Sequence, residues 1–129
     1  MPQVIIHASD SLDVKAQQVI VSEVRQAIPE VLGIDENIGQ VILYKSSFDS
    51  RSIHESRDTA FMFIQISMYP GRSRELKERL ANRVIDVICK YSNVSTRDII
   101  CTISEINPDN YFGGTSHKYI EEIEKGHNK

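Results

Sequence analysis

Two stretches of the chain carry apolar residues at intervals of three and four positions. The first stretch has them at Leu12, Ala16, Val19, Ile20, Val24, Ala27, Ile28 and Val31. The second stretch has them at Leu76, Leu80, Val84, Val87, Ile88 and Tyr91. Because an α-helix turns once every 3.6 residues, each set forms a single apolar stripe. The pattern therefore predicts two amphipathic helices.

The residues around these stretches predict where the helices begin and end. Asp10 and Ser11 are candidate N-caps of the first helix, and Ser73 is the candidate N-cap of the second. Pro29 has no backbone N–H and clashes one turn back along a helix. The first helix should therefore kink or restart near Pro29 and finish before Gly33.

Four short segments have the apolar character of β-strands. They lie at about residues 3–7, 40–46, 59–69 and 98–106. Residues 47–58 are polar and aperiodic, which indicates a connecting loop. The order along the chain is thus strand, helix, strand, loop, strand, helix, strand.

The two halves of the chain match each other at a shift of 60 residues, which places Val41 and Leu43 on Cys101 and Ile103. The chain is therefore interpreted as a duplicated β-α-β unit. Because β-α-β units are right-handed, both helices should lie on one face of the sheet. We expect an α+β fold with a four-stranded mixed sheet and two helices on one face.

The longest predicted strand has apolar side chains on both of its sides. Its residues alternate between Met62, Ile64, Ile66 and Met68 on one side and Phe61, Phe63, Gln65 and Ser67 on the other. Two helices on one face leave the other face of the sheet uncovered. We expect the methionine and isoleucine side to need other cover, for which another subunit is one option.

The length and composition indicate one globular domain. The chain has 129 residues and a mass of 14.7 kDa, and 40% of its residues are hydrophobic. That is enough for a core without a metal or disulfide. We expect one domain over residues 1–129, with halves at about 1–58 and 59–114 and a tail. Residues 118–129 alternate in charge, which predicts a solvated helix or a frayed end.

The charge and the cysteines exclude several classes of protein. The net charge is −3 and no basic stripe is present, which argues against a nucleic-acid partner. No apolar run approaches the roughly 18 residues of a membrane span, and no signal peptide is evident, so we expect a cytoplasmic protein. Cys89 and Cys101 lie in apolar runs, which favours buried free thiols over a redox or metal pair.

Pro2 is a candidate catalytic residue. Removal of the initiator methionine would leave Pro2 with a secondary amine at the N-terminus. A free α-amine titrates near ~7.7–8.0, and burial or nearby cations favour its neutral form. The nitrogen of Pro2 could then act as a general base. The alternative is that Pro2 only begins an edge strand.

Arg72 and Arg74 are candidate anion-binding residues. They follow a Pro-Gly turn at the start of the second predicted helix. Backbone N–H groups in a first helical turn attract anions, and guanidinium groups bind carboxylates through two parallel hydrogen bonds. The alternative is a solvated pair in which Arg74 interacts with Glu78 one turn later.

These features together resemble the tautomerase superfamily. They are a proline after the initiator methionine, the duplicated β-α-β unit, the turn PGRSRELK and the late segment NPDNYFGG. The resemblance covers Met1 to about Gly114. The length and the Arg-x-Arg sequence look most like the malonate semialdehyde decarboxylase branch and related uncharacterised tautomerases.

The resemblance implies a site and an assembly. The nitrogen of Pro2 would be the acid or base, Arg72 would bind a substrate carboxylate or carbonyl oxygen, and Tyr111 or Phe112 would form an apolar wall. It also implies a homotrimer with inward-facing sheets and active sites near the subunit boundaries. Neither a metal nor an organic cofactor is implied.

The chain departs from the decarboxylase pattern at two places. The decarboxylase has an aspartate shortly after its first helix, where the best register here puts Asn37, with Asp35 two residues earlier. Asn37 is therefore a candidate substrate-binding residue. The two arginines of the decarboxylase flank a proline, whereas Arg72 and Arg74 flank Ser73.

The sequence supports three hypotheses about function. The leading one is an enol-keto tautomerase that moves a proton in a small 2-oxo acid, with Pro2 as base and Arg72 on the carboxylate or enolate oxygen. The second is a decarboxylase or hydratase in which Asp35 or Glu36 activates water. The third is a non-catalytic ferredoxin-like module that binds a metabolite, because two β-α-β units also describe such modules.

Overall fold

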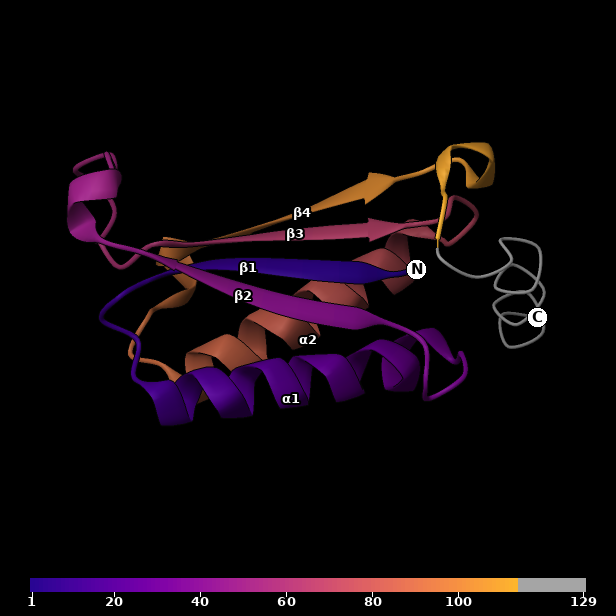
Figure 1. The fold of residues 1–129 in the computed structure, drawn as a ribbon, viewed down its shortest axis with the longest axis horizontal. Helices are drawn as coiled ribbons and strands as arrows, with labels where there is room; N and C mark the ends of the chain where they lie inside the picture. Colours follow the sequence, from indigo (N-terminus) through magenta and orange to yellow (C-terminus); the bar gives the residue numbers. More distant parts are fainter. Residues whose placement is uncertain (114–129) are drawn as a thin grey trace.

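The computed structural model describes residues 1–113, which form a four-stranded sheet and two long helices (Figure 1). The strands are β1 (Gln3–Ser9), β2 (Gln40–Ser46), β3 (Met62–Met68) and β4 (Ile99–Glu105), and the helices are α1 (Val14–Leu32) and α2 (Arg74–Tyr91). The predicted solvated tail, residues 118–129, lies outside the described residues. Within the described part, no helix is long and apolar enough to span a membrane.

The sheet has the strand order β2-β1-β3-β4. Strand β1 is parallel to β2, β3 is parallel to β4, and the central strands β1 and β3 are antiparallel. Both helices cover the same face of the sheet (Figure 1). The predicted α+β fold of two β-α-β units with a mixed sheet is confirmed.

The two units repeat one another at the predicted shift of 60 residues. Val4 pairs with Val41 in the first unit, and Ile64 pairs with Cys101 in the second. The same shift relates four buried residues of α1 to the four of α2, which are Ile20, Val24, Ala27 and Ile28 in α1 and Leu80, Val84, Val87 and Ile88 in α2. The duplication therefore extends to strand register and to the buried helix faces.

The prediction that Asp10 or Ser11 caps α1 is wrong. The cap is Asp13, whose side chain accepts a hydrogen bond from the backbone N–H of Ala16 at 2.9 Å. The hydroxyl of Ser11 is instead hydrogen-bonded to that of Ser9 at 2.5 Å. Helix α1 therefore begins two or three residues later than the sequence pattern suggests.

The other helix ends lie close to their predicted places. The hydroxyl of Ser73 caps α2 by accepting a hydrogen bond from the backbone N–H of Leu76 at 3.1 Å. Gly33 ends α1 in the left-handed conformation, with φ of 67°, and its N–H donates to the carbonyl of Pro29 at 2.9 Å. The helix continues through Pro29 to Leu32 without restarting, although Pro29 has no N–H to donate one turn back.

The strand bounds differ from the prediction at two places. Strand β1 extends to Ser9, beyond the predicted end at residue 7. Strand β3 begins at Met62, because Asp58 forms a turn before it by accepting hydrogen bonds from the N–H groups of Ala60 and Phe61. The predicted strand at 59–69 is therefore too long.

The prediction about which side of β3 lacks cover is also wrong. The side chains of Met62, Ile64, Ile66 and Met68 belong to the core between the sheet and the helices and are at most 1% exposed. Among residues 1–113, no helix covers the other side of the sheet, which we call the outer face. Its residues are Gln3, Ile5 and His7 of β1, Gln40, Ile42 and Tyr44 of β2, Phe63, Gln65 and Ser67 of β3, and Ile100, Thr102 and Ser104 of β4. Exposed apolar side chains are therefore present, but they lie on the outer face, opposite to the side that the sequence predicted.

Candidate active site

Pro2 lies at the end of the sheet where β1 and β2 begin and where β3 and β4 end (Figure 1). The backbone N–H of Gln40 donates a hydrogen bond to the carbonyl oxygen of Pro2 at 3.3 Å. Antiparallel pairing of Gln3 with Ser67 brings Pro2 next to Met68, the last residue of β3. The topology therefore sets Pro2 beside the loops that leave β3 and β4.

The loop from β3 to α2 carries the two candidate arginines. Gly71 has φ of 116°, a conformation that residues with a side chain rarely adopt, and it turns the chain toward α2. Arg72 is half-buried before the cap residue Ser73, whereas Arg74 begins the helix and is exposed. The two arginines therefore lie at the same end of the sheet as Pro2 but differ in burial.

The loop after β4 brings Tyr111 to this end. The backbone N–H of Ile106 donates to the carbonyl of Met68 at 2.7 Å, which keeps the chain beside β3 after β4 ends. The side chain of Asn107 then accepts from the N–H of Asp109 at 2.9 Å and caps the 3₁₀ turn η3 (Pro108–Asn110). Half-buried Tyr111 follows this turn directly.

An aromatic pair joins the two loops. The ring of Tyr111 lies edge-on to the ring of Tyr69, with centroids 5.7 Å apart and an angle of 90°. Tyr69 is 7% exposed, whereas Phe112 is 87% exposed. Sequence reasoning did not single out Tyr69, although its position after a strand and before the Pro-Gly turn was a usable signal. Of the two predicted wall residues, Tyr111 is the one that packs in the described structure.

Asn37 lies in the loop between α1 and β2. Its backbone N–H donates to the side chain of Asp35 at 2.8 Å, and the carbonyl of Glu36 accepts from the guanidinium of Arg25 at 2.9 Å. Asn37 and Glu36 line a shallow hollow beside the end of α1 together with Arg25 and Pro29. The loop is at the same end of the sheet as Pro2, but this hollow is on the helix side.

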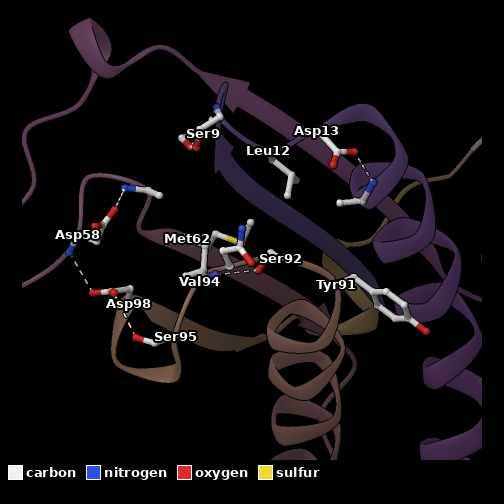
Figure 2. Close-up of a pocket in the computed structure, with 14 residues that line it drawn as sticks. Ser9, Leu12, Asp13, Asp58, Met62, Tyr91, Ser92, Val94, Ser95 and Asp98 are labelled. Carbon is white, nitrogen blue, oxygen red and sulfur yellow. Dashed lines mark hydrogen bonds between the residues drawn. The ribbon is translucent and has the colours of Figure 1, made fainter.

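A pocket of about 660 Å³ opens at the opposite end of the sheet (Figure 2). It lies between the end of β1 and the start of β3 and β4, and its lining includes Ser9, Asp13, Asp58 and Asp98. Pro2 is at the other end of the seven-residue strand β1. This pocket is therefore separate from the predicted site.

The polar groups of that pocket hold turns together (Figure 2). One oxygen of Asp98 accepts from the backbone N–H of Asp58 at 3.0 Å, and the other accepts from the hydroxyl of Ser95 at 3.2 Å. Asp13 caps α1. Asp98 and Asp13 therefore stabilise the local turns and the start of α1. None of the predicted site residues lines this pocket.

The two cysteines are free and half-buried, less buried than the sequence pattern suggests. Burial raises the pKa of the Cys101 thiol to about 11. Burial, with a smaller effect of Asp86, also raises the pKa of Cys89. Both groups are therefore thiols rather than thiolates at neutral pH, which argues against a nucleophilic role.

Gly39 holds the start of β2 next to Pro2, and its replacement is expected to destabilise the fold. Its φ is 111°, and an added Cβ would meet two carbons of Ile28 at 3.2 Å. Gly71 has a similar φ of 116°, which would strain a residue with a side chain, but an added Cβ would meet nothing within 4 Å. Backbone strain alone costs about 1–3 kcal/mol. We expect Gly71→Ala to lower the free energy of unfolding by about that amount and Gly39→Ala to lower it further, as measured by urea denaturation. Equal losses would contradict the close approach of Gly39 to Ile28.

Several solved structures have the same fold as this chain. FG41 malonate semialdehyde decarboxylase inhibited by 3-bromopropiolate is 21% identical, with a TM-score of 0.77 over 93% of this chain and 95% of that chain. Wild-type fused 4-OT, in a structure described as a symmetric trimer, is 14% identical, with a TM-score of 0.79 over 88% of this chain and 93% of that chain. At these identities the similarity shows the fold alone.

Sequence similarity identifies the family directly. A family model described as tautomerase enzyme matches residues 40–113, which is more than half of the chain. The chain belongs to this family. No curated protein matches the chain in sequence.

Proposed function

We propose that the protein is an enol-keto tautomerase of small 2-oxo acids, with the N-terminal amine of Pro2 as its base. The observation that carries the proposal is the meeting of Pro2 with the loops of Arg72 and Tyr111 at one end of the sheet. Family membership adds support, because the matching family model describes enzymes.

In the proposed mechanism, the substrate carboxylate binds the guanidinium of Arg72 through charge-assisted hydrogen bonds. The neutral nitrogen of Pro2 accepts the proton from the enol hydroxyl, and the resulting prolinium returns a proton to the neighbouring carbon. The C–O bond of the enol becomes C=O and its C=C bond becomes a single bond, so atoms and charge balance over the cycle. Tyr111 provides an apolar wall next to the reacting carbons, and Phe112 is a second candidate for this wall. Arg74 and Asn37, which are both exposed, are proposed as peripheral contacts to the substrate.

Met1 must be absent for this mechanism. While Met1 is attached, the nitrogen of Pro2 belongs to an amide and has no basic lone pair. The side chain of Met1 is only 5% exposed, so it also fills space beside Pro2. Removal of Met1 would therefore create both the base and room for a substrate.

We also propose that the protein assembles as a homotrimer through the outer face. Ile42, Tyr44, Phe63 and Ile100 are 37–54% exposed on this face. Covering such large apolar side chains favours association. Fused 4-OT, which shares the fold, is described as a trimer.

A second candidate function is decarboxylation or hydration of a small oxo or unsaturated acid. It is favoured by the 21% identity with malonate semialdehyde decarboxylase over most of both chains. Asp35 is half-buried in the α1–β2 loop and is the candidate carboxylate for activating water. Its contact with the N–H of Asn37 also gives Asp35 a structural role.

One experiment separates these activities. The mature chain is incubated with phenylenolpyruvate and, separately, with malonate semialdehyde, and the loss of enol absorbance and the release of CO₂ are followed. The proposal predicts faster ketonisation than in buffer and no release of CO₂ above background. Release of CO₂ without ketonisation would favour the decarboxylase.

A further inference from the structure

The outer face is uncharged. None of its twelve residues is Asp, Glu, Lys or Arg, although these types make up 26% of the chain. In a symmetric assembly, equivalent surfaces approach one another, so a charged residue on them would meet its own copies. An uncharged face with large apolar side chains therefore suits other copies of the same chain better than a charged partner.

His7 is the one imidazole among the residues of the outer face. It lies on the central strand β1, between Tyr44 on β2 and Phe63 on β3. Its ring stacks on Tyr44, with centroids 5.9 Å apart and an angle of 19°, and is tilted against Phe63 at 6.2 Å. Any surface that covers both Tyr44 and Phe63 also covers the imidazole between them.

The surroundings of His7 suit a neutral ring. Its Nε2 is hydrogen-bonded to the side-chain oxygen of Gln65 at 3.0 Å, and that contact takes one N–H donor. A protonated imidazole has a second N–H donor and a positive charge. The outer face has no carboxylate to balance that charge, and each further copy brings another His7. Burial without a counter-charge disfavours the charged form.

Lys45 of β2 pairs with Ala8 and donates to the carbonyl of Leu12, and other charged groups lie past the strand ends. Arg57 lies over the ring of Phe61, 5.2 Å from its centroid, and Arg51 donates to the carbonyl of Phe61 at 2.6 Å. Asp10 follows the end of β1, where its N–H donates to the carbonyl of Ser46. The helices lie on the other side of the sheet and present no group to His7 (Figure 1). Tyr44 is the other titratable residue of the outer face, and phenols remain neutral below about pH 9.

We propose that His7 makes the assembly of the trimer dependent on pH, because the trimer forms with His7 neutral and weakens when His7 is protonated. This inference rests on the homotrimer proposed above. Imidazole is the side chain that ordinarily changes charge between pH 5 and 8. Separate chains bind the proton more readily than the trimer, so stability of the trimer is present at high pH and is lost as the pH falls through the range in which imidazole titrates.

The expected effect is large because three histidines act together. If each His7 must lose its proton before assembly, each contributes up to about a tenfold change in the association constant per pH unit. Three copies would then weaken the trimer by up to about 1,000-fold per pH unit once the free chains are protonated. A partly hydrated interface would reduce this slope.

Sedimentation velocity of the full-length protein between pH 8 and pH 5 tests the proposal. Wild type is expected to be a trimer at pH 8 and to dissociate below about pH 6.5, while its circular dichroism shows that the chains stay folded. His7→Gln cannot titrate and should keep the same assembly across this range. His54→Gln, a change in an exposed loop, is the matched control and should behave as wild type.

Three results would overturn the proposal. A wild-type trimer that is equally stable at pH 5 and pH 8 would leave the trimer intact but refute the role of His7. Dissociation of His7→Gln at the same pH as wild type would assign the effect to another group. A wild-type monomer at pH 8 would refute the trimer as well.

NMR of the wild-type protein tests the same proposal without any variant, so it does not depend on whether a variant folds. In the proposed trimer, the imidazole proton resonances of His7 should change to the protonated position only as the chains dissociate. Those of exposed His54 should not change when the chains dissociate at a fixed pH. Titration of His7 within an intact trimer would contradict the proposal.

Discussion

Retention of Met1 is expected to abolish ketonisation of phenylenolpyruvate. An amide nitrogen cannot act as a general base, and a positioned base typically contributes about 100- to 10,000-fold to the rate. The buried side chain of Met1 adds a steric block, since only 5% of it is exposed. The rate of a chain with an uncleaved N-terminal extension should therefore fall to that of buffer, as measured by loss of enol absorbance.

A protease site placed directly before Pro2 provides the matched control. Cleavage should restore activity in the same preparation, and intact mass should show the loss of the extension. Pro2→Ala, with its N-terminal methionine removed, keeps an amine of similar basicity but different geometry, so its activity should fall without vanishing. An extended chain as fast as the cleaved chain would show that Pro2 only begins β1.

Replacement of Arg72 by alanine is expected to lower turnover of a 2-oxo acid more than replacement of Arg74. Loss of a charge-assisted contact to the substrate should cost roughly 1.5–3 kcal/mol, or about 10- to 150-fold in kcat/KM. Arg72 is half-buried beside the predicted site, whereas Arg74 is exposed on the first turn of α2. Arg74→Ala should therefore have a smaller effect.

Steady-state kinetics of three variants checks this order. Arg72→Lys keeps the charge but loses the planar pair of donors, so its kcat/KM should lie between that of wild type and that of Arg72→Ala. Circular dichroism should show the same fold for all variants. Equal effects of Arg72→Ala and Arg74→Ala, or no effect of Arg72→Ala, would mean that the carboxylate binds elsewhere.

The order of elements could be predicted because each signal is local. The helical spacing of apolar residues depends on neighbouring turns, and the cap at Ser73 depends on a residue three positions later. Duplication added long-range information, since the shift that aligns Val41 with Cys101 also aligns the strand pairs. The single helix layer then followed from the handedness of β-α-β units, whereas the order of the strands in the sheet was not predicted.

Which face of the sheet packs against the helices could not be predicted in the same way. Strand β3 has large apolar residues on both sides, and alternation identifies two sides without saying which one meets the helices. The buried side carries Ile64 and Ile66, and the outer side carries Phe63 and Gln65. The start of α1 was missed for a related reason. Asp10, Ser11 and Asp13 have equally suitable side chains, and the course of the turn decides which one caps the helix.

The residues of the predicted site came from their own chemistry and from the resemblance to the tautomerase superfamily. Antiparallel pairing of β1 with β3 brings Pro2 to the loop of Arg72, and the sequence predicts these two strands but not their pairing. The contact between Tyr69 and Tyr111 joins residues far apart in the sequence. It depends on the 3₁₀ turn at Pro108–Asn110, which has no periodic signal.

The central claim is that Pro2 has a free, neutral amine in a site for 2-oxo acids, and covalent labelling tests it most directly. The acetylenic 2-oxo acid 2-oxo-3-pentynoate inactivates Pt0534, a structure with this fold. A neutral amine would add across its alkyne, the carbon next to the new bond would gain a proton, and no group would leave. Intact mass should rise by one reagent molecule per chain, peptide mapping should locate it on Pro2, and ketonisation should cease in proportion. Labelling at other residues only, or full activity after Pro2 is labelled, would contradict the account.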